Sequence, residues 1–419
     1  MNRVIVSCMI GNALEWYEFT LYGYFASIIG KLFFPTTDPV ASLIAAFAVF
    51  SAGFLMRPLG AVIFGHIGDK MGRKKALLIS IYLMALPTAL IGLMPTYHDI
   101  GWMASVLLTV IRLLQGISIG GEFTGSMVFI IEHSPDHKRG LSGSYACLSL
   151  AIGIILGSTT AASIFALFSE QAIYEWAWRI PFLMSVFGAV IGAVMRRTLH
   201  DPKIYAEQQE KKTLHAMPVK ELLAHNYKPL LHAISIELVL AVGFYIITIF
   251  LITYMKDFLK ITESVAFRLN TINTIIFALM IPIAGWLSDK YGRRAVMMPA
   301  ILSLLVFSYP LIAMMSYSPM HAFLGQMGLA VALGILFGPI PALLVELFPL
   351  KVRYSALSLA HSLSMSIFGG TAPLLVTQAL KMSGDLMMPA YFLIISAAGS
   401  AVGLWFLRDR YKEPLVALN

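Results

Sequence analysis

The sequence predicts an all-α membrane protein with twelve transmembrane helices in two pseudo-symmetric six-helix halves. Three observations favour this fold class. Of the 419 residues, 58% are hydrophobic and only 12% are charged, whereas soluble domains carry about 25% charged residues. The mean hydropathy is +0.79. Long apolar runs recur along the chain, and two charged loop motifs occur twice.

Each apolar run is long enough to cross the hydrocarbon core as a helix, which takes about 20 residues. We expect spans at about 4–30, 41–67, 76–95, 101–131, 141–168, 179–198, 230–255, 266–287, 295–316, 321–347, 354–380 and 389–407. A polar segment divides them six and six, and we interpret it as an amphipathic linker at the cytoplasmic surface. The expected domains are an N-terminal half at 1–198, the linker at 199–229 and a C-terminal half at 230–419.

The repeated loops support this division. The motif at 65–74 recurs 220 residues later at 285–294. A second motif recurs 214 residues later, with Glu132, Pro135 and Arg139 matched by Glu346, Pro349 and Arg353. Two unrelated motifs that repeat at nearly one spacing indicate homologous halves. Parallel halves around a midplane site suit a transporter that works by alternating access.

The distribution of positive charge predicts the orientation. The formal net charge is +8, and 22 of the 30 Lys and Arg residues lie in segments expected on the cytoplasmic side. This positive-inside asymmetry explains the charge without a nucleic-acid partner. An even number of spans then places both termini in the cytoplasm of a bacterium, with the chain in its inner membrane. Both cysteines fall in predicted spans, so we expect neither disulfides nor metal clusters.

The first span contains two carboxylates. Glu15, Glu18 and Tyr22 fall within about 60° of one another on a helix. An ionised carboxylate at this depth costs several kcal/mol unless it faces the protein interior, finds a cation or takes up a proton. We therefore expect these acids to be functional.

Arg112 is the expected partner of these acids, because both spans place their polar residue near the midplane. A buried guanidinium is permanently charged and needs an anion, which is Glu15, Glu18 or the carboxylate of a substrate. A static ion pair and a pair that opens for substrate or proton both remain possible at this point.

Other polar residues lie within the spans. Glu122 is about 15 Å further toward the cytoplasm than Arg112 at 1.5 Å per residue, where Arg57 is a candidate partner in an inner gate, a proton path or a structural pair. Glu237 is isolated in span seven, with His232 the nearest basic residue in sequence. His361 in span eleven is a titratable group at membrane depth, or a hydrogen-bonded core residue.

The loops at Asp69 and Asp289 are predicted to act as conformational latches. Asp69 ends span two beside Arg73, and an aspartate there can meet a helix N-terminus or a facing arginine such as Arg139. A charge network of this kind breaks when the two halves open.

The two Gly-x-x-x-Asp-(Arg/Lys)-x-Gly-Arg-(Arg/Lys) loops resemble the signature of the major facilitator superfamily. Further strings resemble its metabolite:proton symporter family, whose members carry carboxylates such as citrate, 2-oxoglutarate and shikimate, or zwitterions such as proline and betaine. These strings are Gly-Asn-x-x-Glu-Trp-Tyr-Glu in the first span, Arg57-Pro-Leu-Gly60, Arg112-Leu-Leu-Gln-Gly116 followed by Gly120-Gly-Glu122, Trp178-Arg-Ile-Pro-Phe182 and Phe368-Gly-Gly-Thr-Ala-Pro373.

The resemblance implies a role in substrate binding or proton coupling for Arg112. Two positions depart from the family pattern. Glu18 stands where Asp is usual, and His361-Ser362 stand where Tyr-Asn is frequent. Both departures bear on the identity of the substrate.

Together these observations predict a proton-coupled symporter that takes up a small organic anion, with a carboxylate metabolite as the main expectation. There is no Gly-x-x-x-x-Gly-Lys-(Ser/Thr) loop, so the proton gradient is the expected energy source and no cofactor is expected. The alternatives are a carrier of a zwitterion such as proline or betaine and, far behind, a channel or a non-transporting sensor. We expect a monomer that is not an enzyme.

Two groups of residues are the candidates for function. The candidate substrate and proton site is Glu15, Glu18, Tyr22, Arg112, Gln115, Glu122 and His361. The candidate gate is Arg57, Asp69, Arg73, Arg139, Asp289, Arg293 and Arg353.

Overall fold

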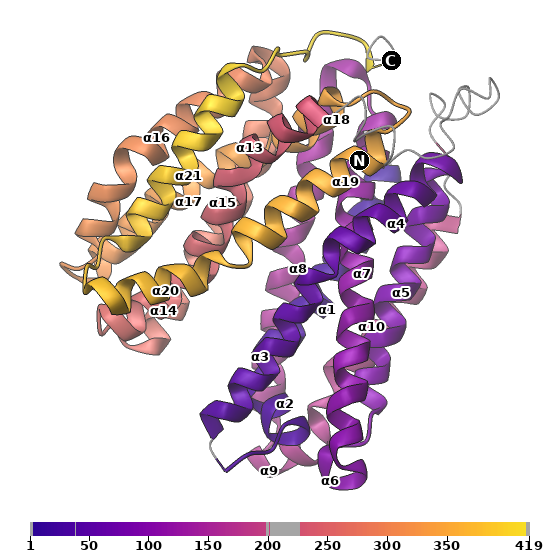
Figure 1. Cartoon of the computed structure of the whole chain (residues 1–419), viewed down its shortest axis with the longest axis vertical. Coiled ribbons are helices and arrows are strands. Elements are labelled where there is room, and N and C mark those ends of the chain that lie inside the picture. Colours follow the sequence, from indigo (N-terminus) through magenta and orange to yellow (C-terminus); the bar gives the residue numbers. More distant parts are fainter. Residues whose placement is uncertain (1–2, 38, 198–200, 202–226, 416–419) are drawn as a thin grey trace. The chain divides into compact units, whose positions relative to one another are not determined.

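The computed structural model describes residues 3–37, 39–197, 201 and 227–415 (Figure 1). These residues are almost all helical and include no strand. Eleven helical segments among them are long and apolar enough to cross a membrane. The predicted all-α membrane fold is confirmed. Most of the expected linker, at 199–200 and 202–226, lies outside the described residues.

Twelve spans were expected, and the difference lies in the first. Its residues are helical, but they form two helices, α1 (Arg3–Tyr24) and α2 (Ala26–Phe33), instead of one. Neither belongs to the eleven apolar segments among the described residues. Asn12, Glu15 and Glu18 lower the hydropathy of α1, and all three side chains are buried in protein.

Contacts divide the chain into two compact units. The first unit is Met1–Phe129 with Ser149–Pro218, and the second unit is Ile130–Leu148 with Val219–Asn419. The turn between spans four and five is thus part of the second unit, although it lies in the first half of the sequence.

The first half of the chain continues after α2 with short and long helices whose ends follow local signals. Pro58 lies in the first turn of α4, where its missing N–H costs nothing, and a bend at Met56 separates α4 from α3. Gly72 has φ +114° and links α4 to α5, a conformation that favours glycine. The helices are α3 (Pro39–Leu55), α4 (Arg57–Lys70), α5 (Arg73–Leu93), α6 (Tyr97–Ile100), α7 (Trp102–Glu132), α8 (Arg139–Leu167), α9 (Glu170–Ala172) and α10 (Arg179–Arg197).

The second half contains several π-helical turns, which often mark functional positions inside helices. They lie at Tyr245–Phe250, Tyr254–Phe258 and Met365–Gly369. The α-helices are α13 (Tyr227–Phe244), α14 (Leu251–Thr253), α15 (Glu263–Tyr291), α16 (Arg293–Met314), α17 (Pro319–Phe337), α18 (Ile340–Leu347), α19 (Arg353–Ser364), α20 (Ala372–Ser383) and α21 (Met388–Trp405).

Glycines let α7 pack directly against the backbone of α3 and α4. A Cβ on Gly116 would lie 2.1 Å from the carbonyl oxygen of Gly53, and a Cβ on Gly120 would lie 2.3 Å from that of Arg57. Close approach through small residues is the usual way for helices to associate in membranes. It brings Arg112 and Glu122, which flank these glycines, into the interior of the first unit.

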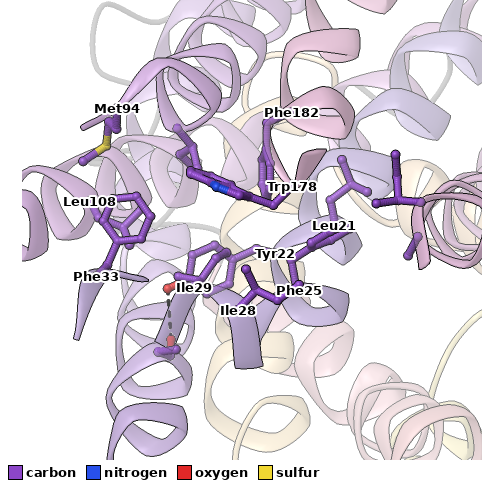
Figure 2. Close-up of a cluster of buried hydrophobic side chains, with 14 of the residues drawn as sticks. Leu21, Tyr22, Phe25, Ile28, Ile29, Phe33, Met94, Leu108, Trp178 and Phe182 are labelled. Carbon is purple, nitrogen blue, oxygen red and sulfur yellow. Dashed lines mark hydrogen bonds between the residues drawn. The ribbon is translucent and has the colours of Figure 1, made fainter. Parts of the chain in front are cut away.

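A cluster of large apolar side chains fills one end of the first unit (Figure 2). Trp178, which directly precedes α10, packs edge-on against Phe33 of α2, with ring centroids 5.7 Å apart. Tyr22 of α1 points into the same cluster and donates a hydrogen bond of 3.1 Å to the carbonyl oxygen of Ala46. The cluster fixes the end of α1 that follows the two glutamates.

Candidate functional site

The acidic face of α1 is turned into the first unit. Glu15, Glu18 and Tyr22 are all buried, with 3%, 2% and 0% of their surfaces exposed. The helical spacing that groups them in the sequence therefore also directs them away from lipid. Glu18 contacts Thr88 of α5, and the ring of Tyr22 lies against Arg112 of α7.

A chain of hydrogen bonds joins Glu18 to Arg112. The guanidinium donates to Gln115 Oε1 at 2.7 Å, and Gln115 Nε2 donates to Thr88 Oγ1 at 2.6 Å. The Thr88 hydroxyl lies 2.7 Å from Glu18 Oε2. We call these four side chains the relay. The sequence interpretation expected Arg112 to pair directly with Glu15 or Glu18. That expectation was wrong, because Gln115 and Thr88 occupy the space between the two charges.

Aromatic rings surround the guanidinium of Arg112 on its other sides. Its central carbon lies 4.2 Å from the ring centroid of Tyr22, 5.2 Å from that of Phe50 and 5.8 Å from that of Phe19. Such cation–π contacts partly replace hydration. Within the described part of the chain, no carboxylate lies at ion-pair distance from Arg112, and its Nε has no hydrogen-bond partner.

Glu122 forms an ion pair with Arg196 in the last turn of α10, a residue that the sequence interpretation did not name. Arg196 Nη1 donates to Glu122 Oε2 at 2.9 Å, Nη2 contacts Oε1, and the Ser80 hydroxyl also donates to Oε2. The expected pair with Arg57 is wrong. Arg57 instead lies over the ring of Phe54, at 5.6 Å. The sequence position of Arg57 does not fix the direction of its side chain around α4.

Gly11 makes room for this ion pair. A Cβ at Gly11 would lie 1.7 Å from Arg196 Nη2 and 2.7 Å from Glu122 Oε1. The sequence signals for this arrangement were two arginines in the last turn of α10 and a glycine one turn before Glu15.

In the second unit, Glu237 and His361 form a buried pair. His361 Nδ1 lies 2.8 Å from Glu237 Oε1, and both side chains are nearly inaccessible. His232 is the nearest basic residue to Glu237 in sequence, but the residue that pairs with Glu237 is His361. His361 is 124 residues away in sequence, but α19 packs against α13.

A network of ion pairs organises the Asp289 loop. Arg293 Nη1 binds Asp289 at 2.8 Å and Arg293 Nη2 binds Glu346 at 3.0 Å. Arg139 Nε also lies 3.0 Å from Glu346. The Asp289 carboxylate accepts from the backbone N–H groups of Gly140 and Leu141, at the N-terminus of α8, where the helix dipole favours an anion.

The matching residues of the other copy of each repeated motif also form ion pairs. Arg353 Nη1 binds Glu132 Oε1 at 3.0 Å, and Asp69 binds Arg73 at 2.5 Å. Arg139, the suggested partner of Asp69, is engaged with Glu346 instead. The pairs Arg139–Glu346 and Glu132–Arg353 explain why contacts assign 130–148 to the second unit.

Two aspartates that the sequence interpretation missed support the loops. Asp201 accepts from the backbone N–H of Lys74 at 2.8 Å, and Asp409 accepts from that of Arg294 at 2.9 Å. Each therefore binds the N-terminus of the helix after a repeated loop. Each follows the last helix of its half, which was a signal available in the sequence.

Comparison with known proteins places this architecture in a family. The profile described as "Sugar (and other) transporter" matches residues 4–211, and the profile "Major Facilitator Superfamily" matches residues 233–418. The glycine betaine/proline/ectoine/pipecolic acid transporter OusA of Dickeya dadantii is 36% identical over 432 residues, which cover 99% of this chain and 85% of that protein. The citrate-proton symporter of Klebsiella pneumoniae is 32% identical over 417 residues, covering 98% and 91%.

A solved structure shares the fold. The proton:xylose symporter XylE bound to 6-bromo-6-deoxy-D-glucose matches with a TM-score of 0.83 at 15% identity, over 99% of this chain and 98% of that one. The predicted resemblance is thus confirmed by relatives that cover nearly the whole chain. This chain belongs to the major facilitator superfamily of multi-pass membrane transporters, alongside the betaine/proline and citrate carriers.

Proposed function

We propose that this chain is a proton-coupled symporter for a small zwitterion of the proline or betaine kind. The observation that carries the proposal is the state of Arg112, a buried cation with no carboxylate partner in the described part of the first unit. A permanently charged guanidinium in a low-dielectric interior attracts an anion strongly. The carboxylate of a substrate supplies one.

The aromatic rings around Arg112 favour a zwitterion. When a carboxylate draws the guanidinium toward itself, the faces of Tyr22, Phe50 and Phe19 become available to a second cation. Aromatic faces bind ammonium and quaternary ammonium groups by cation–π attraction. The betaine and proline carrier at 36% identity supports the same class of substrate.

The relay provides a route for coupling to protons. A substrate carboxylate that takes the hydrogen bonds of Arg112 releases Gln115, and through Thr88 this changes the surroundings of Glu18. Glu18 then loses the stabilising influence of the cation, and a buried carboxylate without it favours the protonated form. Substrate binding and protonation of Glu18 thus support one another. The carrier works as a monomer in a bacterial inner membrane, with both termini in the cytoplasm, as the positive-inside distribution favours.

A di- or tricarboxylate is the second candidate substrate. Arg57 is also buried and forms no ion pair in the described residues. An anion with more than one charge is better balanced by two cations than by one. The citrate symporter at 32% identity supports this candidate.

The test is uptake by purified protein in proteoliposomes that contain a pH-sensitive dye. Radiolabelled glycine betaine, proline and citrate are compared with and without an imposed pH gradient, at a clamped membrane potential. We expect glycine betaine or proline to accumulate and to carry protons inward. Uptake that is unchanged when the pH gradient is removed would rule out proton coupling. Accumulation of citrate alone would establish the second candidate.

A further inference from the structure

A small cavity lies inside the first unit, between α1, α5, α7 and α10. Three carboxylates line it, from Glu15, Glu18 and Glu122, and the rest of its wall is apolar apart from the backbone at Gly11. The relay reaches this cavity only through Glu18. The cavity is therefore separate from the position of Arg112, where the proposed substrate binds.

Glu15 has no hydrogen-bond partner in the described residues, although it is 97% buried. Leaving both oxygens of a carboxyl unsatisfied costs more than the net value of an ordinary hydrogen bond. The charged groups that act on it are Glu122, Arg57, Arg196 and Glu18. The Glu15 carboxyl faces a cavity that two other carboxylates line. A water molecule or a proton there would satisfy its unpaired oxygens.

The three levels of the cavity follow α1. Glu18, Glu15 and Gly11 are on successive turns of the helix, about 5 Å apart at 1.5 Å per residue. Glu18 lies at the level of the relay, Glu15 lies one turn further toward the N-terminus, and Gly11 contacts the Glu122–Arg196 pair. Polar groups therefore mark a line from the relay to the last turn of α10.

We propose that this cavity is a proton branch, in which Glu15 stores the proton that Glu18 releases and the Glu122–Arg196 pair closes the far end. The proposal rests on the proton coupling proposed above. In each transfer one O–H bond breaks on Glu18 as one forms on a cavity water, and that water passes a proton to the Glu15 carboxylate. No electrons are exchanged, and the water is restored. The proton thus leaves by a path that the substrate does not share.

Glu15→Gln is the decisive variant, because it keeps the shape of the side chain and removes no hydrogen bond. Proteoliposomes with internal pH dye and radiolabelled glycine betaine report two quantities, proton-driven accumulation and counterflow of preloaded substrate. We expect accumulation to fall at least ten times more than counterflow. Substrate binding should keep its dependence on external pH in Glu15→Gln and lose it in Glu18→Gln. Glu15→Asp, which restores a titratable group, should recover part of the accumulation.

Equal accumulation by Glu15→Gln and wild type would overturn the proton branch. If wild-type protein carries glycine betaine, proline or citrate without any change in internal pH, the proposed function fails instead. The two failures are thus distinguishable.

Gly11→Ala tests the closed end, and Gly23→Ala on the same helix is its control. A methyl group at Gly11 displaces Arg196 from Glu122, whereas one at Gly23 has no atom within 4 Å. We expect Gly11→Ala to raise the substrate-free proton leak several-fold and Gly23→Ala to leave it unchanged. Equal leaks would contradict the assignment of the Glu122–Arg196 pair. If Gly11→Ala does not fold, the Glu15 series decides the proposal alone.

Discussion

The two units treat their buried charges differently. In the second unit every buried Asp, Glu, Arg or Lys side chain of the described residues has a partner, as in Arg293–Glu346, Arg353–Glu132 and Glu237–His361. In the described part of the first unit, four buried Asp, Glu or Arg side chains form no ion pair, namely Glu15, Glu18, Arg57 and Arg112.

The difference separates buried charges with a structural role from buried charges with a functional role. A buried ion pair holds helices in register, and removing one partner is costly. A buried charge without a partner stabilises nothing and persists where a ligand or proton completes it. The second unit therefore contributes the fixed network, and the first unit contributes the groups that change state. Each variant below breaks or sharpens this contrast.

The largest expected effect is on stability in the second unit. Glu346→Gln removes the buried carboxylate that Arg293 and Arg139 share, and leaves them only Asp289 and Asp136 as counter-charges. Breaking a buried pair in this way typically costs about 3–5 kcal/mol, so we expect a large fall in the thermal unfolding temperature in detergent. Glu413→Gln is the control, because its pair with Arg408 is exposed and is worth less than about 1 kcal/mol. Similar shifts for both variants would refute the structural role of the network.

The next effect is on binding in the first unit. Arg112→Lys keeps the charge but loses the planar fork that binds a carboxylate bidentately. We expect the affinity for the transported zwitterion or carboxylate to fall about 10–100-fold, consistent with about 1.5–3 kcal/mol for a charged hydrogen bond. Isothermal titration or counterflow measures it. The control Arg179→Lys changes an arginine that binds the backbone carbonyls of Gly92 and Met94, and its affinity should stay near wild type.

An intermediate effect is expected at the repeated loops. Asp69→Asn and Asp289→Asn weaken contacts to Arg73 and to the N-terminus of α8. We expect slower transport with substrate affinity unchanged within a few-fold, because neither aspartate reaches the relay. Rates of exchange and equilibrium binding distinguish the two quantities. A large loss of affinity at a normal rate of exchange would contradict a role in conformational change.

A smaller effect is expected at the centre of the relay. Thr88→Val keeps the shape of the side chain but removes the hydroxyl between Gln115 and Glu18. We expect binding to change little and the dependence of binding on pH to weaken. Thr88→Ser retains the hydroxyl and should behave like wild type. Identical pH profiles for all three proteins between pH 5 and 8 would show that the relay carries no coupling.

The smallest effect is expected at Asp99, outside the spans. The backbone N–H of Thr96, together with its hydroxyl, donates hydrogen bonds that hold the pKa of the Asp99 carboxyl below its usual value. The resulting stabilisation is present above the unfolded pKa of about 3.9 and is lost as the pH falls through the lower folded pKa. Asp99→Asn should therefore leave the pH profile of uptake between 5 and 8 unchanged. A shift there would show that an exposed turn, and not the membrane interior, sets the pH dependence.

The sequence by itself determined the all-helical membrane fold. Apolar runs of spanning length leave few alternatives in a bilayer, because every backbone group must be hydrogen-bonded within the protein. Helical periodicity also grouped Glu15, Glu18 and Tyr22 on one buried face.

Only the tertiary structure decided the partners. Depth and periodicity do not say which helices are neighbours or how each is rotated, so the sequence suggested Arg57 for Glu122, whereas the packing of α10 against α5 and α1 supplies Arg196. Thr88 gave no signal, because a threonine in a span is usually a local hydrogen-bonding residue, and Gln115 was a candidate site residue whose position between Arg112 and Thr88 the sequence did not show. Hydrogen bonds and ion pairs form over about 3 Å, and positions at that scale depend on how the helices pack.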